Sequence, residues 1–134
     1  MIRWYITPAA GWTAEMREEV SFGERWRFMV LAPESADASL RITPDERDVM
    51  PPSKWEETTA RIDRLKGRRV LECRFGDFAG HSVEFSAEDE WIRGWVLFVD
   101  KLALDATYRC KLHDAGRDDL AIESMLNSLR LEDQ

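Results

Sequence analysis

The chain is poor in the residues that build disulfide frameworks and metal sites, because its 134 residues include only two cysteines and two histidines. Two cysteines cannot form the framework of a small secreted domain, and the four residues show no spacing typical of metal ligands. A glycine-rich phosphate loop is also missing from the sequence. We therefore expect neither a metal centre nor a bound cofactor.

A basic surface and a long apolar run are missing as well. Lysine and arginine number 19 against 26 aspartates and glutamates, a net charge of -7, which argues against nucleic acid and favours a basic protein as partner. No apolar run approaches the roughly 18 residues that span a bilayer. The opening "MIRWYITPAAGW" lacks the layout of a secretory signal. These absences predict a cytoplasmic protein without a membrane partner.

The most strongly patterned stretch is "WIRGWVLFVDKLALDATYRC", residues 91–110. If Asp100 and Lys101 form a two-residue turn, the stretch folds into a β-hairpin in which the residue numbers of each facing pair add up to 201. One face then carries an almost wholly apolar ladder, as a strand pair facing a core should. Its facing pairs are Val99–Leu102, Leu97–Leu104, Trp95–Ala106, Arg93–Tyr108 and Trp91–Cys110.

The opposite face of this hairpin is apolar on its first strand and polar on its second. Two hypotheses explain it: a helix covers this face, or the face is open and binds a partner. In the second hypothesis, apolar residues of an earlier strand extend the surface. The predicted partner-binding residues are Ile92, Val96, Phe98, Met29 and Leu31.

Apolar residues alternate in four further segments, which predicts strands around residues 26–30, 40–42, 71–75 and 83–85, with a loop over 76–80. Helical spacing and a capping box (Ser53 and Glu56) predict a helix over 53–67. A second helix follows from the stripe Ile122, Met125, Leu126 and Leu129. The predicted fold is one α+β domain over residues 1–134, a single antiparallel β-sheet flanked by helices.

Three local patterns invite a catalytic or metal-binding interpretation, and each falls short. "GHSVE" resembles a nucleophile elbow, but Glu84 stands where the second glycine belongs, so Ser82 is expected to be an exposed strand residue. Cys110 lies near His113 on the apolar ladder, which predicts a buried and inert thiol. The acidic run at residues 88–90 lacks the alternating ligands of a calcium loop. We expect no enzyme.

The order of motifs resembles the PsbP-like domains, a fold shared with the Ran-binding Mog protein. The matching motifs are "YITPAAGWTAE", a "SLRI" strand, an amphipathic helix, "RFGDFAGHSVEF", the long hairpin and a terminal "LNSLRL". The resemblance implies an α/β/α sandwich that binds other proteins. Members include photosystem subunits, a Ran partner and bacterial chaperones of secreted effectors. The stretch "EDEWIRGWV" departs from the pattern, and no family site residue can be carried over.

These observations favour a non-catalytic protein-binding module. The specific expectation is a bacterial adaptor, chaperone or immunity-type protein, linked to secretion, which binds another protein or itself through an apolar sheet face. The alternative is a domain that binds a small molecule or lipid in an aromatic cavity lined by Trp91, Trp95 and Tyr108. An enzyme that gathers carboxylates from distant strands is the third hypothesis.

Overall fold

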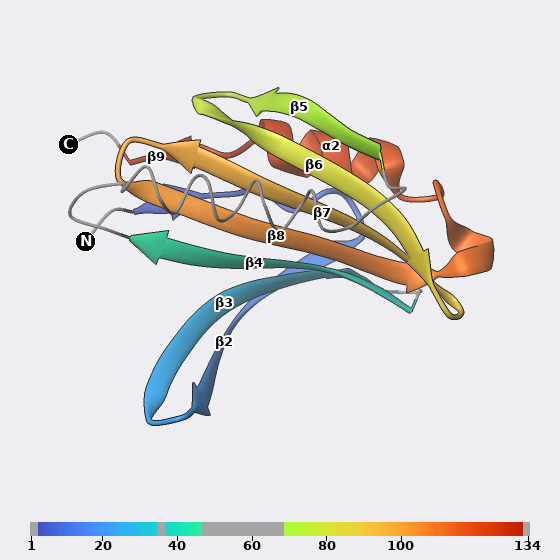
Figure 1. The fold of residues 1–134 in the computed structure, drawn as a ribbon, viewed down its shortest axis with the longest axis horizontal. Helices are drawn as coiled ribbons and strands as arrows, with labels where there is room; N and C mark the ends of the chain where they lie inside the picture. The colour runs from blue at the N-terminus through green and yellow to red at the C-terminus, as the bar shows by residue number, and fades with distance from the viewer. Residues whose placement is uncertain (1–2, 35–36, 47–68, 133–134) are drawn as a thin grey trace.

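The computed structural model describes residues 3–34, 37–46 and 69–132. Seven strands form an antiparallel sheet with the order β2-β3-β4-β8-β7-β6-β5 (Figure 1). Their bounds are β2 Trp12–Ser21, β3 Glu24–Pro33, β4 Ala38–Glu46, β5 Arg69–Phe75, β6 Phe78–Ala87, β7 Glu90–Val99 and β8 Leu102–Lys111. A second, small sheet pairs β1 (Trp4–Tyr5) with β9 (Arg130–Leu131). The short 3-10 helix η1 (Leu112–Asp114) and the helix α2 (Asp119–Asn127) follow β8.

The predicted α+β fold, a single antiparallel β-sheet flanked by helices as in an α/β/α sandwich, is wrong. In the described ranges the chain is mostly β-strand, and α2 is their single α-helix. The predicted helix over 53–67 lies outside the described residues. The main omission is β2, whose sequence "WTAEMREEVS" has an apolar alternation that Glu18 interrupts, and whose residues 13–20 are exposed on both faces of the strand.

The register predicted for residues 91–110 is confirmed. Val99 pairs with Leu102 across the Asp100–Lys101 turn, and the ladder runs without a slip to Trp91 opposite Cys110. A related prediction, the loop over 76–80, is too long. Gly76 and Asp77 alone form the turn, and β6 begins at Phe78, because this side chain is fully buried and pairs with Phe75.

One side of the sheet, here called the core face, holds the main hydrophobic core. It bears Leu97, Leu104 and Tyr108, and α2 packs on it in the predicted way through Ile122 and Met125 (Figure 1). Burial of these side chains removes apolar surface from water, which stabilises the fold by about 25 cal/mol per Å². The other side of the sheet, here called the second face, bears the alternate residues of each strand.

The hairpin of β2 and β3, here called the ribbon, bends away from the remaining strands (Figure 1). β2 and β3 pair along their full length, from Trp12–Pro33 to Ser21–Glu24. In contrast, the pairing of β3 with β4 extends only from Met29 to Leu31 in the described chain. The outer part of the ribbon therefore stands clear of the core, and its curvature hollows the second face.

Candidate functional site

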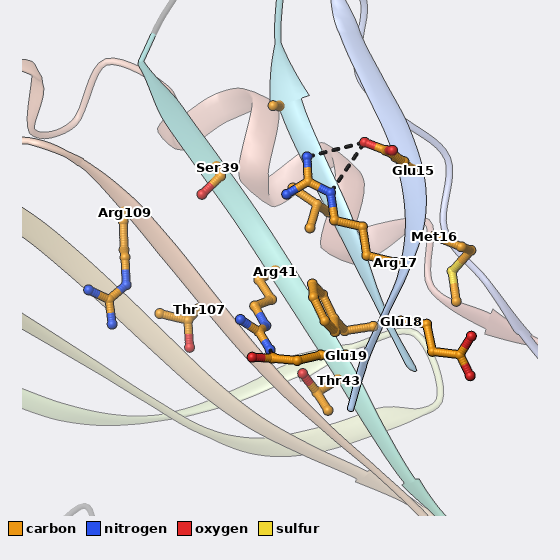
Figure 2. Close-up of a pocket in the computed structure, with 13 residues that line it drawn as sticks. Glu15, Met16, Arg17, Glu18, Glu19, Ser39, Arg41, Thr43, Thr107 and Arg109 are labelled. Atoms are coloured by element: carbon orange, nitrogen blue, oxygen red, sulfur yellow. Dashed lines mark hydrogen bonds and ion pairs between the residues drawn. The ribbon is translucent and has the colours of Figure 1, made fainter. Parts of the chain in front are cut away.

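The second face carries a groove of about 1160 Å³ between the ribbon and the centre of the sheet (Figure 2). Its floor comes from alternate residues of β4 and β8, because strand pairing places Arg41 beside Thr107 and Ser39 beside Arg109. Its wall comes from the ribbon. The side chains on the groove side are Glu15, Arg17, Glu19, Phe28, Val30, Ala32, Ser39, Arg41, Thr43, Thr107 and Arg109.

Arg41 is the best-placed cation of the groove. Its guanidinium lies 3.7 Å from the centroid of the Phe28 ring, and its Nη2 atom lies 3.5 Å from Oε2 of Glu19. A guanidinium that stacks on a ring face is attracted by the ring quadrupole and loses rotamer freedom. The stack therefore holds a flat, charged platform at the junction of the ribbon and the sheet.

The other charges of the groove pair loosely. Arg17 meets Glu15 at 3.1 Å, as Figure 2 shows by dashed lines, and Arg109 meets Glu90 at 3.3 Å. All four side chains are about half exposed or more, so solvent screens these pairs and each contributes little to stability. Such pairs can be exchanged for ion pairs with a partner at small cost. Met16 and Glu18 point away from the groove (Figure 2).

A smaller hollow of about 220 Å³ adjoins the groove on the second face. It lies where Gly94 has no side chain, and Val83, Val96, Asp105 and Thr107 surround it. Thr107 lines both hollows, so the polar groove and this more apolar patch form one continuous surface.

The five predicted partner-binding residues do not share one face. Ile92, Val96 and Phe98 lie on the second face, where Ile92 is only 6% exposed and the other two are half-buried. Met29 and Leu31 lie on the core face, since Met29 pairs with Ile42 and this strand row continues to Ala106 and Trp95. Leu31 is fully buried there.

The three aromatic residues of the predicted ligand cavity all lie on the core face. Trp95 and Tyr108 are buried among core side chains, and Trp91 packs against them. The Tyr108 hydroxyl donates a hydrogen bond to Oδ2 of Asp118, just before α2. Burial, together with this bond to a carboxylate, raises the pKa of Tyr108. These contacts tie β8 to the start of α2.

Asp118 accepts a second hydrogen bond, from Arg117 Nη2 at 3.0 Å. Burial alone would raise the pKa of Asp118, but the hydrogen bonds from Arg117 and Tyr108 outweigh it and hold the pKa below the usual aspartate value. The Asp118 side chain makes no capping hydrogen bond to the helix. It therefore serves as a structural link between α2, Arg117 and the core.

The candidate catalytic residues lie apart from the groove. Ser82 is 7% exposed on the core face opposite Trp95, so the expectation of an exposed strand residue is wrong. Cys110 is buried, as predicted, whereas His113 is exposed and lies 3.6 Å from Asp114. Cys73 and Cys110 are both free, on strands separated by β6 and β7. In the described ranges, no three His, Cys, Asp or Glu side chains gather as metal ligands.

Comparisons with known proteins show the fold and nothing more specific. No family model and no curated protein matches the chain. A crystal structure from Bacteroides thetaiotaomicron matches 98% of this chain with a TM-score of 0.58 and 12% sequence identity. The chain spans about half the length of that protein, since 48% of it is covered. Within the described residues, no helix is long and apolar enough to cross a membrane.

Sequence reasoning missed the groove, although a signal was present. Polar residues alternate with buried ones in "SLRIT" and in "ATYRC", at Ser39, Arg41 and Thr43 and at Thr107 and Arg109. This alternation marks a solvated sheet face. What the sequence could not supply is the bend of the ribbon that converts a flat face into a groove.

Proposed function

We propose that the protein is a non-catalytic protein-binding module whose partner docks on the second face, in the groove beneath the ribbon. The observation that carries the proposal is the projection of the ribbon, which leaves Trp26 exposed two residues before Phe28, the ring on which Arg41 stacks. Tryptophan and arginine are the residues most enriched at the energetic centres of protein interfaces. Arg41 lines the groove and Trp26 pairs with Glu19, which also lines it, and this arrangement favours a docking role.

The shape and chemistry of the groove favour a macromolecular partner over a small ligand. Small-molecule sites are enclosed and mostly apolar, whereas this groove is open and lined by hydroxyl groups and paired charges. It offers guanidinium groups to acidic side chains and carboxylates to basic ones. Specificity would come from complementarity with both signs of charge, although the net charge of -7 steers a basic partner towards the molecule.

An adaptor or chaperone role fits this surface best, and the sequence resemblance to PsbP-like domains supports it. Such proteins hold an extended or partly folded client, and an open groove along a sheet can accept a client without a tailored pocket. Two further sequence-based hypotheses, an immunity-type protein and a link to secretion, would use the same surface.

The test is affinity capture from an extract of the organism that encodes the protein, followed by titration of the purified partner. Three immobilised proteins are compared: the wild type, the groove variant Trp26→Ala/Thr107→Arg, and Leu120→Ser as control. Leu120 is a strongly exposed apolar residue of α2, away from the groove. Circular dichroism and thermal unfolding establish that all three share one fold.

We expect one protein to be retained by the wild type and by Leu120→Ser, and its affinity for the groove variant to fall at least tenfold. Thr107→Arg fills the floor of the groove, and Trp26→Ala removes an exposed anchor. A partner that binds the folded groove variant as tightly as the wild type would contradict the proposal. Loss of the partner by Leu120→Ser would place the docking surface elsewhere.

A further inference from the structure

We propose that two copies of the chain associate through the outer edges of their β2 strands, which pair antiparallel about a two-fold axis at Met16. β2 is the terminal strand of the seven-stranded sheet, so within the described residues no strand pairs with its outer edge. An edge strand of ten residues presents a row of backbone donors and acceptors that another strand can satisfy.

The turn of the ribbon determines which backbone groups face outward. Phe22 and Gly23 form a two-residue loop with φ values of 51° and 78°, the pattern of a type I′ turn. The pair that closes such a loop, Ser21–Glu24, is hydrogen-bonded, and bonded pairs alternate along the ribbon. The even-numbered residues of β2 therefore direct their N–H and C=O groups away from β3. Met16 lies at the centre of this outward row.

The side chains of β2 are self-complementary about Met16. Antiparallel pairing about this residue joins residue i to residue 32 minus i of the second copy. Glu15 then faces Arg17 of the second copy, and Arg17 faces Glu15, which gives two pairs of opposite charge. Every other facing pair between residues 12 and 20 is apolar or joins a charged residue to a neutral one. No like charges meet.

Neighbouring registers lack this complementarity. A continuous sheet keeps each residue on its own face, so the axis must shift by whole residues. An axis at Glu15, Arg17 or Glu18 brings that charged residue against its own copy. An axis at Ala14 avoids like charges, but it pairs only residues 12–16 and forms no pair of opposite charge. The axis at Met16 alone combines long overlap with favourable charges.

The same register covers apolar side chains that the single chain leaves in water. Met16 is 55% exposed and would pack against Met16 of the second copy. Val20 is 68% exposed and would face Trp12 of the second copy. Removing these side chains from water supplies a driving force that edge hydrogen bonds alone lack.

This association goes beyond the proposed function. The groove opens on the second face, whereas the pairing uses the strand edge and the even-numbered side chains on the core-face side, such as Met16. The two surfaces share Glu15 and Arg17, so the variants that separate the proposals are Met16→Lys for the association and Trp26→Ala/Thr107→Arg for the groove. Failure of one proposal is therefore distinguishable from failure of the other. A chain that stays monomeric and still binds its partner through Trp26 and Thr107 would refute only the association.

The first experiment measures self-association by sedimentation equilibrium of the full chain from about 5 to 500 µM. We expect a concentration-dependent dimer for the wild type and for Leu120→Lys. Met16→Lys, which brings two ammonium groups together on the axis, should weaken dimerisation at least tenfold. A wild-type monomer throughout this range overturns the proposal, as does a dimer that Met16→Lys leaves intact.

The second experiment tests the register by charge reversal. Glu15→Arg and Arg17→Glu should each weaken the dimer at least fivefold, because each creates two like-charge pairs. The double variant Glu15→Arg/Arg17→Glu re-forms both opposite pairs and should restore the dissociation constant to within about twofold. In a register centred on Glu18, Arg17 would face Glu19 instead, and the double variant would not be rescued. Lack of rescue therefore overturns the register at Met16.

Discussion

Replacement of Gly80 by alanine should destabilise the protein more than most surface or strand substitutions. Gly80 is buried in β6 and pairs with Leu97 of β7. A Cβ atom built on Gly80 would lie 1.7 Å from the carbonyl oxygen of Val96 and 2.8 Å from its carbonyl carbon. Both are backbone atoms, so no side-chain rotation can relieve the clash. Strand β6 or β7 must move.

The size of the effect follows from this displacement. A carbon–oxygen contact needs about 3.3 Å, so the strands must separate by about 1.5 Å. A hydrogen bond of about 2.9 Å would stretch beyond 4 Å and be lost. Two lost hydrogen bonds cost about 1–3 kcal/mol, and strain in the adjoining core around Leu97 and Phe78 adds about 1–3 kcal/mol. Alanine also lowers the conformational entropy of the unfolded chain, which offsets less than about 1 kcal/mol of this loss. These contributions sum to a net loss of about 1–6 kcal/mol, with a central value of about 3 kcal/mol.

The assay is urea unfolding followed by tryptophan fluorescence, which reports on the core through the buried Trp95. Gly94→Ala is the matched control, since its Cβ would meet the Val83 Cγ1 atom at 3.4 Å and the Ala106 carbonyl oxygen at 3.9 Å, which are ordinary contact distances. The control should change the free energy of unfolding by less than about 1 kcal/mol. If Gly80→Ala is as stable as the control, the close approach of β6 and β7 is not present in the molecule.

Two further predictions concern the ribbon tip and the link to α2. Phe22→Asn should raise the free energy of unfolding by about 0.5–1 kcal/mol in the same urea assay, because Asn-Gly suits the type I′ turn in which Phe22 has φ of 51°; a loss of stability would contradict this. Asp118 has a pKa below its usual value of 3.8, so its stabilising contribution is complete above that pH and is lost as the pH falls through the lowered pKa. The advantage of the wild type over Asp118→Asn should therefore be constant from pH 7 to pH 5 and shrink towards pH 3, and an advantage that persists unchanged at pH 3 would refute the linkage.

Sequence patterns predicted the elements that bury one face in the core and expose the other face to solvent. The register of residues 91–110 followed from the alternation around Leu97 and Leu104, and α2 followed from the spacing of Ile122 and Met125. Both patterns arise because a single packed core selects one face of each element. Apolar alternation also predicted the strands β3 and β4, but it did not predict the register in which they pair.

Apolar alternation alone does not predict the structure of the ribbon. β2 carries charges on both of its faces because, beyond Trp12, its side chains are exposed to solvent, and Glu18 interrupts the apolar alternation of the strand. Met29 and Leu31 were placed on the partner surface because their pairing with Ile42 and Leu40 is a long-range contact that no local pattern encodes. The candidate groove depends on the bend at this junction, and for that reason the groove required the structure.

The short junction between β3 and β4 also sets how the ribbon opens. Met29, Val30 and Leu31 pair with β4, while the outer ribbon is supported in the described chain by β2 and β3 alone. A two-stranded segment with few buried contacts opens locally at a much lower free energy than central strands such as β7 and β8. Amide hydrogens of the outer ribbon should therefore exchange with solvent well before those of the sheet centre. A molecule that binds the ribbon must offset the entropy lost when the ribbon becomes ordered. This cost weakens binding, so we expect short-lived and reversible complexes.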